Sequence, residues 1–184
     1  MNDSLFCWTE VKLRFAVRKI SRLYPPELLA IDFDGCLTDD HVLIDETGKE
    51  FVRVSRKDGL GAGRLKALGI TVIIISTEEN LVVSQRAKKM KVEVRQGVLN
   101  KQVALEEFAH GLGIDRERTW AIGNDVNDTS LFQAAGVTIC PSDASVEIKA
   151  IADLTLPVKG GKGILNFLAK SLEKNRFRSG RNPN

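Results

Sequence analysis

Cysteine and histidine are scarce in this sequence, and neither has the spacing of a known structural site. The three cysteines, Cys7, Cys36 and Cys140, are an odd number, lie far apart and form no CxxC pair. We therefore expect no disulfide framework and no zinc site, and a reducing cytoplasm is the expected location. The two histidines, His41 and His110, also lack the spacing of metal ligands and are interpreted as structural.

Long apolar runs are missing too. No hydrophobic stretch approaches the ~20 residues of a membrane-spanning helix, and the first residues do not combine a charged start with an apolar stretch as a signal peptide does. Internal repeats and low-complexity segments are also absent. A chain of 184 residues with ordinary globular composition is expected to form one domain with a sizeable core.

Acidic residues are rare at both ends of the chain. Residues 1–24 hold five basic and two acidic residues, and residues 174–184 hold four basic residues and no acid, so the body between them is acidic. No basic stripe interleaved with aromatics crosses that body, which argues against nucleic-acid binding. We expect an N-terminal helical extension over 1–26, a domain over 27–175 and a basic flexible tail over 176–184.

The pattern at residues 9–24 fits two structures, because apolar residues recur both at helical spacing and in alternation. A helix is preferred, and Pro25 and Pro26 are expected to end it, since proline supplies no N–H and crowds the preceding turn. Such a basic amphipathic helix can contact a membrane surface, its own domain or a partner subunit, and packing within the protein is preferred.

Strand and helix patterns then alternate along the chain. Apolar runs typical of buried strands lie at 28–32, 71–76, 119–123 and 137–140, with shorter ones at 92–94 and 154–156. Helical patterns lie at 59–69, 80–91, 101–112, 128–136, 145–152 and 163–175. This alternation predicts an α/β domain of three layers, with a mostly parallel sheet covered on both faces. Residues 41–55 indicate a β-hairpin that turns at Thr47 and Gly48.

Polar residues gather where the predicted strands end and where one predicted helix begins. The set is Asp32, Asp34, Ser76, Thr77, Lys101, Asn124, Asp125 and Asp128. Ligands of open α/β sheets bind beyond the carboxyl ends of the strands, so we expect these residues at one edge. Clustered carboxylates suit a hard cation such as Mg²⁺, and a lysine with a hydroxyl suits phosphate oxygens. One aspartate can be a nucleophile and a second can transfer protons.

These residues resemble the four ordered motifs of the haloacid dehalogenase superfamily of phosphatases. The motifs are DFDGCLTD at 32–39, Ser76 after an apolar run, Lys101, and GNDVND at 123–128, and the resemblance runs from about Leu28 to Leu172. The chain is most similar to the capless branch that hydrolyses phosphates of eight- and nine-carbon keto sugar acids. That branch shares the hairpin, RKDGLG at 56–61, RAKKMK at 86–91 and GGKG at 160–163. The GGKG segment lacks P-loop spacing and is expected to be a flexible turn.

The resemblance implies a role for each matching residue. Asp32 is the implied nucleophile and Mg²⁺ ligand, and Asp34 the general acid/base that binds the metal through its backbone carbonyl. Ser76 and Lys101 would hold the phosphoryl group, and Asn124, with Asp125 and Asp128, would complete the metal site. The implied substrate contacts are Gly35, Arg56, Gly59, Thr77, Glu78, Arg86 and Lys89. Arg86 and Lys89 are three positions apart and share one face of a helix. This face either binds a carboxylate of the substrate or is simply exposed to solvent. The family also implies a homotetramer in which a neighbouring subunit roofs the site.

Two positions separate the possible functions. Glu78 stands where octulosonate phosphatases usually have arginine, which favours a nine-carbon substrate, as does the resemblance to the C-terminal domain of acylneuraminate cytidylyltransferases. Asn124 stands where relatives usually have a metal-binding aspartate, so Mg²⁺ binding should be weaker. A non-catalytic assembly or ligand-binding module is therefore the alternative to a phosphatase. A receiver-type signalling domain fits less well, because receivers lack the second acid, Asp34.

Overall fold

The structure is a computed structural model that describes the backbone of residues 3–176 and the side chains of residues 11–173. Six strands form one sheet in the order β5-β4-β1-β6-β7-β8, and every neighbouring pair is parallel. Their bounds are β1 Leu28–Ile31, β4 Thr71–Ile75, β5 Glu93–Arg95, β6 Thr119–Ile122, β7 Val137–Cys140 and β8 Leu154–Thr155. The predicted mostly parallel α/β sheet is confirmed.

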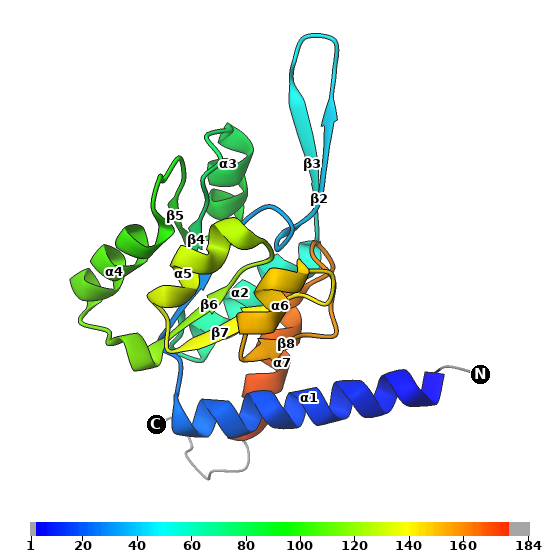
Figure 1. Cartoon of the computed structure of the whole chain (residues 1–184), viewed down its shortest axis with the longest axis vertical. Coiled ribbons are helices and arrows are strands. Elements are labelled where there is room, and N and C mark those ends of the chain that lie inside the picture. The colour runs from blue at the N-terminus through cyan, green and yellow to red at the C-terminus, as the bar shows by residue number, and fades with distance from the viewer. Residues whose placement is uncertain (1–2, 177–184) are drawn as a thin grey trace.

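Helices cover both faces of this sheet, which gives the three predicted layers (Figure 1). One face packs against α1 Asp3–Leu23, α2 Arg56–Ala67, α3 Leu81–Met90 and α7 Ile164–Arg176. The other packs against α4 Lys101–Leu112, α5 Thr129–Gln133 and α6 Val146–Ile151. Two short 3-10 helices, η1 Arg116–Arg118 and η2 Val126–Asp128, lie beside β6. The central strands β1, β4 and β6 are largely apolar because both of their faces are buried, whereas the edge strands β5 and β8 are partly exposed.

Strand β1 lies at the centre of the sheet and is completely buried. Its last residue, Ile31, pairs with Ile74 on one side and Ile122 on the other, so three strands end at the same level. The residues that follow them, including Asp32 and Ser76, therefore emerge side by side at the carboxyl edge.

The predicted hairpin is present and consists of β2 Thr38–Ile44 and β3 Glu50–Val54, which are antiparallel. It projects away from the body as a long arm (Figure 1). Large apolar side chains on this arm face solvent, and Leu43 is 75% and Ile44 is 62% exposed. A monomer would therefore leave a sizeable apolar surface on the arm uncovered.

Residues 9–23 are helical, as preferred, and helix α1 begins earlier than expected, at Asp3. It ends at Leu23, just before the two prolines, and its buried Val17 belongs to the core beneath α7. The Arg18 guanidinium donates to the backbone oxygen of Ser171, and the Trp120 indole N–H donates to Tyr24 O. The helix is thus packed on its own domain. Within residues 3–176, no helix is both long enough and apolar enough for a membrane span. Residues 177–184 of the predicted tail lie outside the described residues.

Candidate active site

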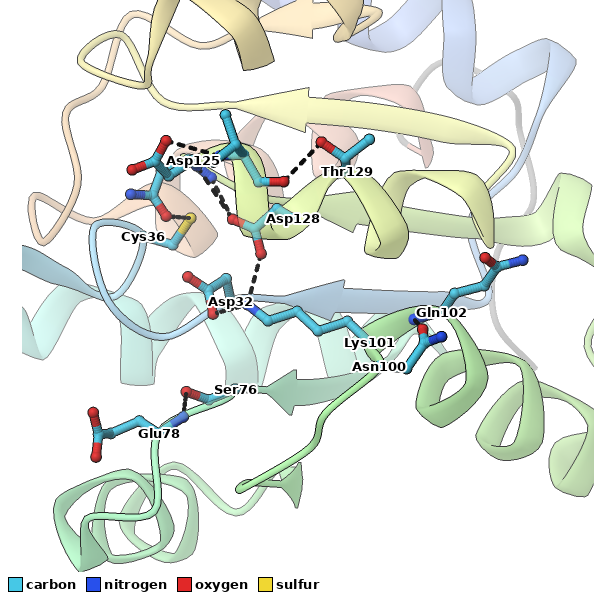
Figure 2. Close-up of polar contacts among 12 residues, drawn as sticks. Asp32, Cys36, Ser76, Glu78, Asn100, Lys101, Gln102, Asp125, Asp128 and Thr129 are labelled. Carbon is cyan, nitrogen blue, oxygen red and sulfur yellow. Dashed lines mark hydrogen bonds and ion pairs between the residues drawn. The ribbon is translucent and has the colours of Figure 1, made fainter.

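The carboxyl edge of the sheet brings together a buried cluster of three charged residues. Lys101, at the first turn of α4, places its Nζ atom 2.5 Å from Asp32 Oδ1 and 2.7 Å from Asp128 Oδ1. Figure 2 shows this side chain reaching between the two carboxylates. All three residues are at most 4% exposed. Buried charges are tolerated only when they are paired, and here a single ammonium pairs with two carboxylates.

The pKa shifts in this cluster follow from burial and from the surplus of acid. Burial, and next the neighbouring Asp128, raise the pKa of Asp32 from 3.8 to about 7, although Lys101 opposes the rise. Burial alone would lower the pKa of Lys101, but the two carboxylates outweigh it and raise that pKa. In the absence of a ligand the cluster therefore holds one positive charge against two acidic groups. This imbalance makes it a candidate functional site.

Asp34 is half-buried and is held by the loop that follows it. The hydroxyl of Thr38 donates to Asp34 Oδ1 at 3.2 Å and accepts the backbone N–H groups of Gly35 and Asp40. Gly35 has a φ of +71°, a conformation that favours glycine. Burial, opposed by the Thr38 hydrogen bond, raises the pKa of Asp34, as a proton-transferring acid requires.

Both carboxylate oxygens of Asp128 accept hydrogen bonds from other groups of the protein. Oδ1 accepts from Lys101, and Oδ2 accepts the backbone N–H of Asn124 at 2.8 Å and of Asp125 at 3.3 Å. Its contacts are therefore those of a residue that positions the lysine and the loop. Asp125 is exposed, and its carboxylate accepts the Val126 N–H at the start of η2. Direct metal binding by Asp125 or Asp128 stays a prediction.

The remaining metal-binding candidates provide a converging set of oxygens. One end of the Asn124 side-chain amide lies 2.7 Å from the backbone oxygen of Asp34 and 3.2 Å from Asp32 Oδ2. A carboxylate, a carbonyl and an amide oxygen are the hard donors that Mg²⁺ takes, so these residues fit such a cation. Among residues 11–173, no cluster of three His, Cys, Asp or Glu side chains forms a metal site. The set found here differs because it uses a backbone carbonyl and an amide.

Ser76 and Glu78, which follow β4, lie on the opposite side of Asp32 from Asp128 (Figure 2). Ser76 is buried, and its hydroxyl accepts the N–H of Glu78 at 3.1 Å, while Thr77 and Glu78 are exposed. The Glu78 carboxylate is close enough to contribute to the raised pKa of Asp34, after burial. Ser76 and Glu78 thus adjoin the two aspartates.

The other predicted substrate contacts are dispersed. The Arg86 guanidinium is turned toward the start of α2 and donates to Ser55 O at 2.7 Å, whereas Lys89 is exposed. Arg56 is exposed at the start of α2, and Gly59 lies one turn further along, where a Cβ atom would be 3.9 Å from the Arg86 guanidinium. A joint role of Arg86 and Lys89 in binding a carboxylate stays a prediction.

The predicted turn before α7 is present in the GGKG segment, and it packs against the loop that carries Asp34, while its flexibility stays a prediction. Gly161 N donates to Cys36 O at 2.9 Å, and Gly160 N donates to Asp143 Oδ1 at 2.9 Å. A Cβ atom on Gly160 would lie 2.1 Å from Gly35 O. Only a residue without a side chain allows this approach.

Sequence reasoning missed two buried polar residues: Thr38, which holds Asp34, and Asp58, which joins α2 to the start of α7. Asp58 is 1% exposed and accepts the N–H of Leu165, at the start of α7, across 107 positions of sequence. Both residues stand inside quoted motifs, DFDGCLTD and RKDGLG, which is the signal that could have identified them.

Fold and site together define a hydrolase with a three-layer α/β fold and a buried cluster of acidic residues around a lysine. The model of the haloacid dehalogenase-like hydrolases matches residues 65–168. The chain belongs to this family, and it is an enzyme of the phosphatase type.

Two curated relatives have similar sequences. The chain is 30% identical over 133 residues to the 3-deoxy-D-manno-octulosonate 8-phosphate phosphatase KdsC of Haemophilus influenzae, covering 72% of this chain and 74% of that protein. It is 34% identical over 142 residues to the N-acylneuraminate cytidylyltransferase of Oncorhynchus mykiss, covering 73% of this chain. That match spans only 32% of the length of the cytidylyltransferase.

A solved structure has the same fold. It is the 3-deoxy-D-manno-octulosonate 8-phosphate phosphatase of Moraxella catarrhalis, in complex with magnesium ion, phosphate ion and KDO molecule. Its TM-score is 0.79 at 26% identity, and the match covers 88% of this chain and 95% of that one.

Proposed function

We propose that this protein is a Mg²⁺-dependent phosphatase that removes the terminal phosphate from an eight- or nine-carbon 2-keto-3-deoxy sugar acid. The observation that carries the proposal is the buried pair of Asp32 and Lys101 beside the half-buried Asp34. A nucleophile, a cation for the phosphoryl oxygens and a proton donor thereby meet at one edge of the sheet.

The proposed reaction has two steps. An Asp32 oxygen attacks phosphorus and the P–O bond to the sugar breaks, while Asp34 gives its proton to the leaving sugar oxygen. Asp34, now a carboxylate, then takes a proton from water as the water oxygen attacks the aspartyl-phosphate. Inorganic phosphate and the Asp32 carboxylate are released. The raised pKa of Asp34, caused by burial, supports its starting as the protonated acid.

The residues proposed to hold Mg²⁺ are Asp32, Asp34 through its backbone oxygen, and Asn124. When bound, the cation supplies positive charge near the phosphoryl oxygens, which adds to that of Lys101. Lys101 and the Ser76 hydroxyl would orient the phosphoryl group. The magnesium and phosphate ions in the Moraxella catarrhalis structure support this assignment.

Two observations bear on the sugar acid. The similarity to octulosonate 8-phosphate phosphatases supports an eight-carbon substrate. The similarity to the cytidylyltransferase, together with Glu78 at the mouth of the site, favours a nine-carbon acid such as sialic acid 9-phosphate. We propose the nine-carbon acid as the better substrate.

We also propose that the protein is a homotetramer in which the hairpin of one subunit roofs the site of the next. The exposed apolar side chains of the hairpin, at Val42, Leu43, Ile44 and Phe51, support this proposal. A second copy that covers them would bury surface which otherwise faces water.

The decisive experiment measures phosphate release from nine- and eight-carbon sugar-acid phosphates, with Mg²⁺ and with EDTA. Asp32→Asn is the control, because it keeps the shape of the side chain and removes the nucleophile. We expect Mg²⁺-dependent release that this substitution abolishes. Equal release by the wild-type protein and Asp32→Asn would refute the proposal.

The alternative, a non-catalytic module, rests on Asn124 and on the partial match to the cytidylyltransferase. It predicts that wild-type protein is inactive and that Asn124→Asp gains Mg²⁺-dependent activity. A fully active wild-type protein excludes it.

A further inference from the structure

The backbone of Asn124 is fixed on both sides, so only its side-chain amide is free to change direction. The Asn124 N–H donates to Asp128 Oδ2 at 2.8 Å, and its backbone oxygen accepts the N–H of Ser145 at 2.8 Å. The residue is 9% exposed. The side chain lies close against Gly35, where a Cβ atom would come within 1.9 Å of Asn124 Nδ2. An amide oxygen and an amide nitrogen are similar in size, so the two orientations fit the same space.

The two orientations present opposite chemistry to the same pair of oxygens. With the nitrogen inward, the amide donates to Asp34 O at 2.7 Å and to Asp32 Oδ2 at 3.2 Å. With the oxygen inward, three oxygens converge without a proton between them, which is favourable only around a cation. In that second orientation the Cys36 thiol lies 3.7 Å from the amide oxygen and donates to it.

We propose that Asn124 is a neutral switch: its amide nitrogen closes the cation position in the metal-free protein, and Mg²⁺ binding turns the amide oxygen inward. The inference rests on the proposed function only for the identity of the cation. An aspartate at this position cannot donate, so it would place a third carboxylate beside Asp32 and Asp128 whenever the metal is absent. Compared with aspartate, asparagine therefore stabilises the metal-free protein and weakens Mg²⁺ binding. Both effects arise because the amide carries no negative charge.

The direct test is NMR of the wild-type protein, whose 20.3 kDa permits assignment of side-chain amides. In EDTA we expect the Asn124 NH₂ group to be protected from hydrogen exchange. Saturating Mg²⁺ should abolish this protection and shift both proton signals. The internal control is Asn80, whose NH₂ donates to Glu50 Oε2 at 3.0 Å and should not respond. An Asn124 NH₂ group that is unprotected in EDTA, or unchanged by Mg²⁺, overturns the proposal.

The second test compares the thermal unfolding of Asn124→Asp with that of the wild type across a Mg²⁺ titration. We expect the variant to melt about 4 °C or more below wild type in EDTA and to bind Mg²⁺ about ten-fold more tightly. Asn127→Asp adds the same charge at an exposed position three residues away and should change neither quantity to this extent. A variant as stable as wild type in EDTA contradicts the proposal.

The outcomes also separate this proposal from the proposed function. Neither readout uses turnover, so an Asn124 amide that responds to Mg²⁺ in a protein without phosphatase activity would uphold the switch and refute the function. Phosphatase activity in a protein whose Asn124 amide does not respond to Mg²⁺ would uphold the function and refute the switch.

Discussion

The Nζ atom of Lys101 lies 2.7 Å from Oδ1 of Asp128, and both side chains are sealed from solvent. The same ammonium lies 2.5 Å from Asp32, so one cation balances two acids that come from different strand ends. This contact makes the stability of the protein depend on residues that the proposed chemistry also needs.

Replacing Lys101 by methionine should destabilise the fold. The change leaves Asp32 and Asp128 buried without their cation, which costs about 3–5 kcal/mol of unfolding free energy at neutral pH. Urea denaturation measures the loss, and adding Asp128→Asn should recover part of it. Lys88→Met, an exposed control on α3, should change stability little. A loss below about 1 kcal/mol for Lys101→Met would contradict the role given to this pair.

Asp58 should make stability fall as the pH rises. Burial raises the pKa of Asp58 to about 6 from 3.8, so between these values the folded protein binds the proton more tightly than the unfolded chain. The stabilising contribution of the neutral acid is therefore complete below about pH 4 and lost as the pH passes 6.

Asp58→Asn tests this pH dependence, because the amide keeps an acceptor for the Leu165 N–H. Urea unfolding at pH 4.5, 5.5 and 7 should show the variant gaining on wild type as the pH rises. Asp115→Asn, at an exposed position where the side chain makes no cap hydrogen bond, is the matched control. A stability difference between Asp58→Asn and wild type that stays constant with pH would rule out the explanation.

Gly160→Ala should impair catalysis while the protein still folds. Its methyl group would collide with Gly35 O, so the loop that carries Asp34 must move. Displacement of a catalytic group by about 1 Å can cost about 100-fold in rate, and we expect a loss of that order in kcat. Gly111→Ala, in α4, meets no atom within 4 Å and should leave kcat unchanged. Equal kcat values for the two variants would show that the contact with Gly35 is dispensable.

Leu43→Asp should disrupt the proposed tetramer. The substitution places a charge in the middle of the exposed apolar surface of the hairpin, where a second copy would have to bury it. Light scattering coupled to size exclusion should give a mass near four chains for wild type and a lower mass for the variant. Leu99→Asp alters a leucine outside the hairpin that is even more exposed than Leu43, and this variant should keep the wild-type mass. A monomeric wild-type protein would contradict the tetramer outright.

Local patterns predicted the sheet and the place of the candidate site residues because both depend on neighbours in sequence. The run at 71–76 is apolar and β-branched, and the strand β4 it predicted is buried on both faces. Asp32, Ser76 and Lys101 were expected at one edge. The parallel register places Asp32 and Ser76 there, and the contact with Asp32 places Lys101 beside them.

Contacts between distant segments were not predictable in this way. The packing of Gly160 on Gly35 and the bond from Leu165 to Asp58 depend on how the chain turns after β8, for which the sequence carries no local signal. The contact of Arg86 with Ser55 was not predictable either. Helical spacing shows which residues share a face of α3, but it does not show that this face lies against the start of α2.

The pairing of α1 with α7 has a consequence for how the protein is made. Among the described elements, helix α1 is synthesised first, and α7, which packs against it, is synthesised last. Domains synthesised from the N-terminus fold as units, so Val17 and its neighbours wait for almost the whole chain before reaching their final partner. Until then the apolar side chains of α1 that belong to this core stay exposed in the growing chain.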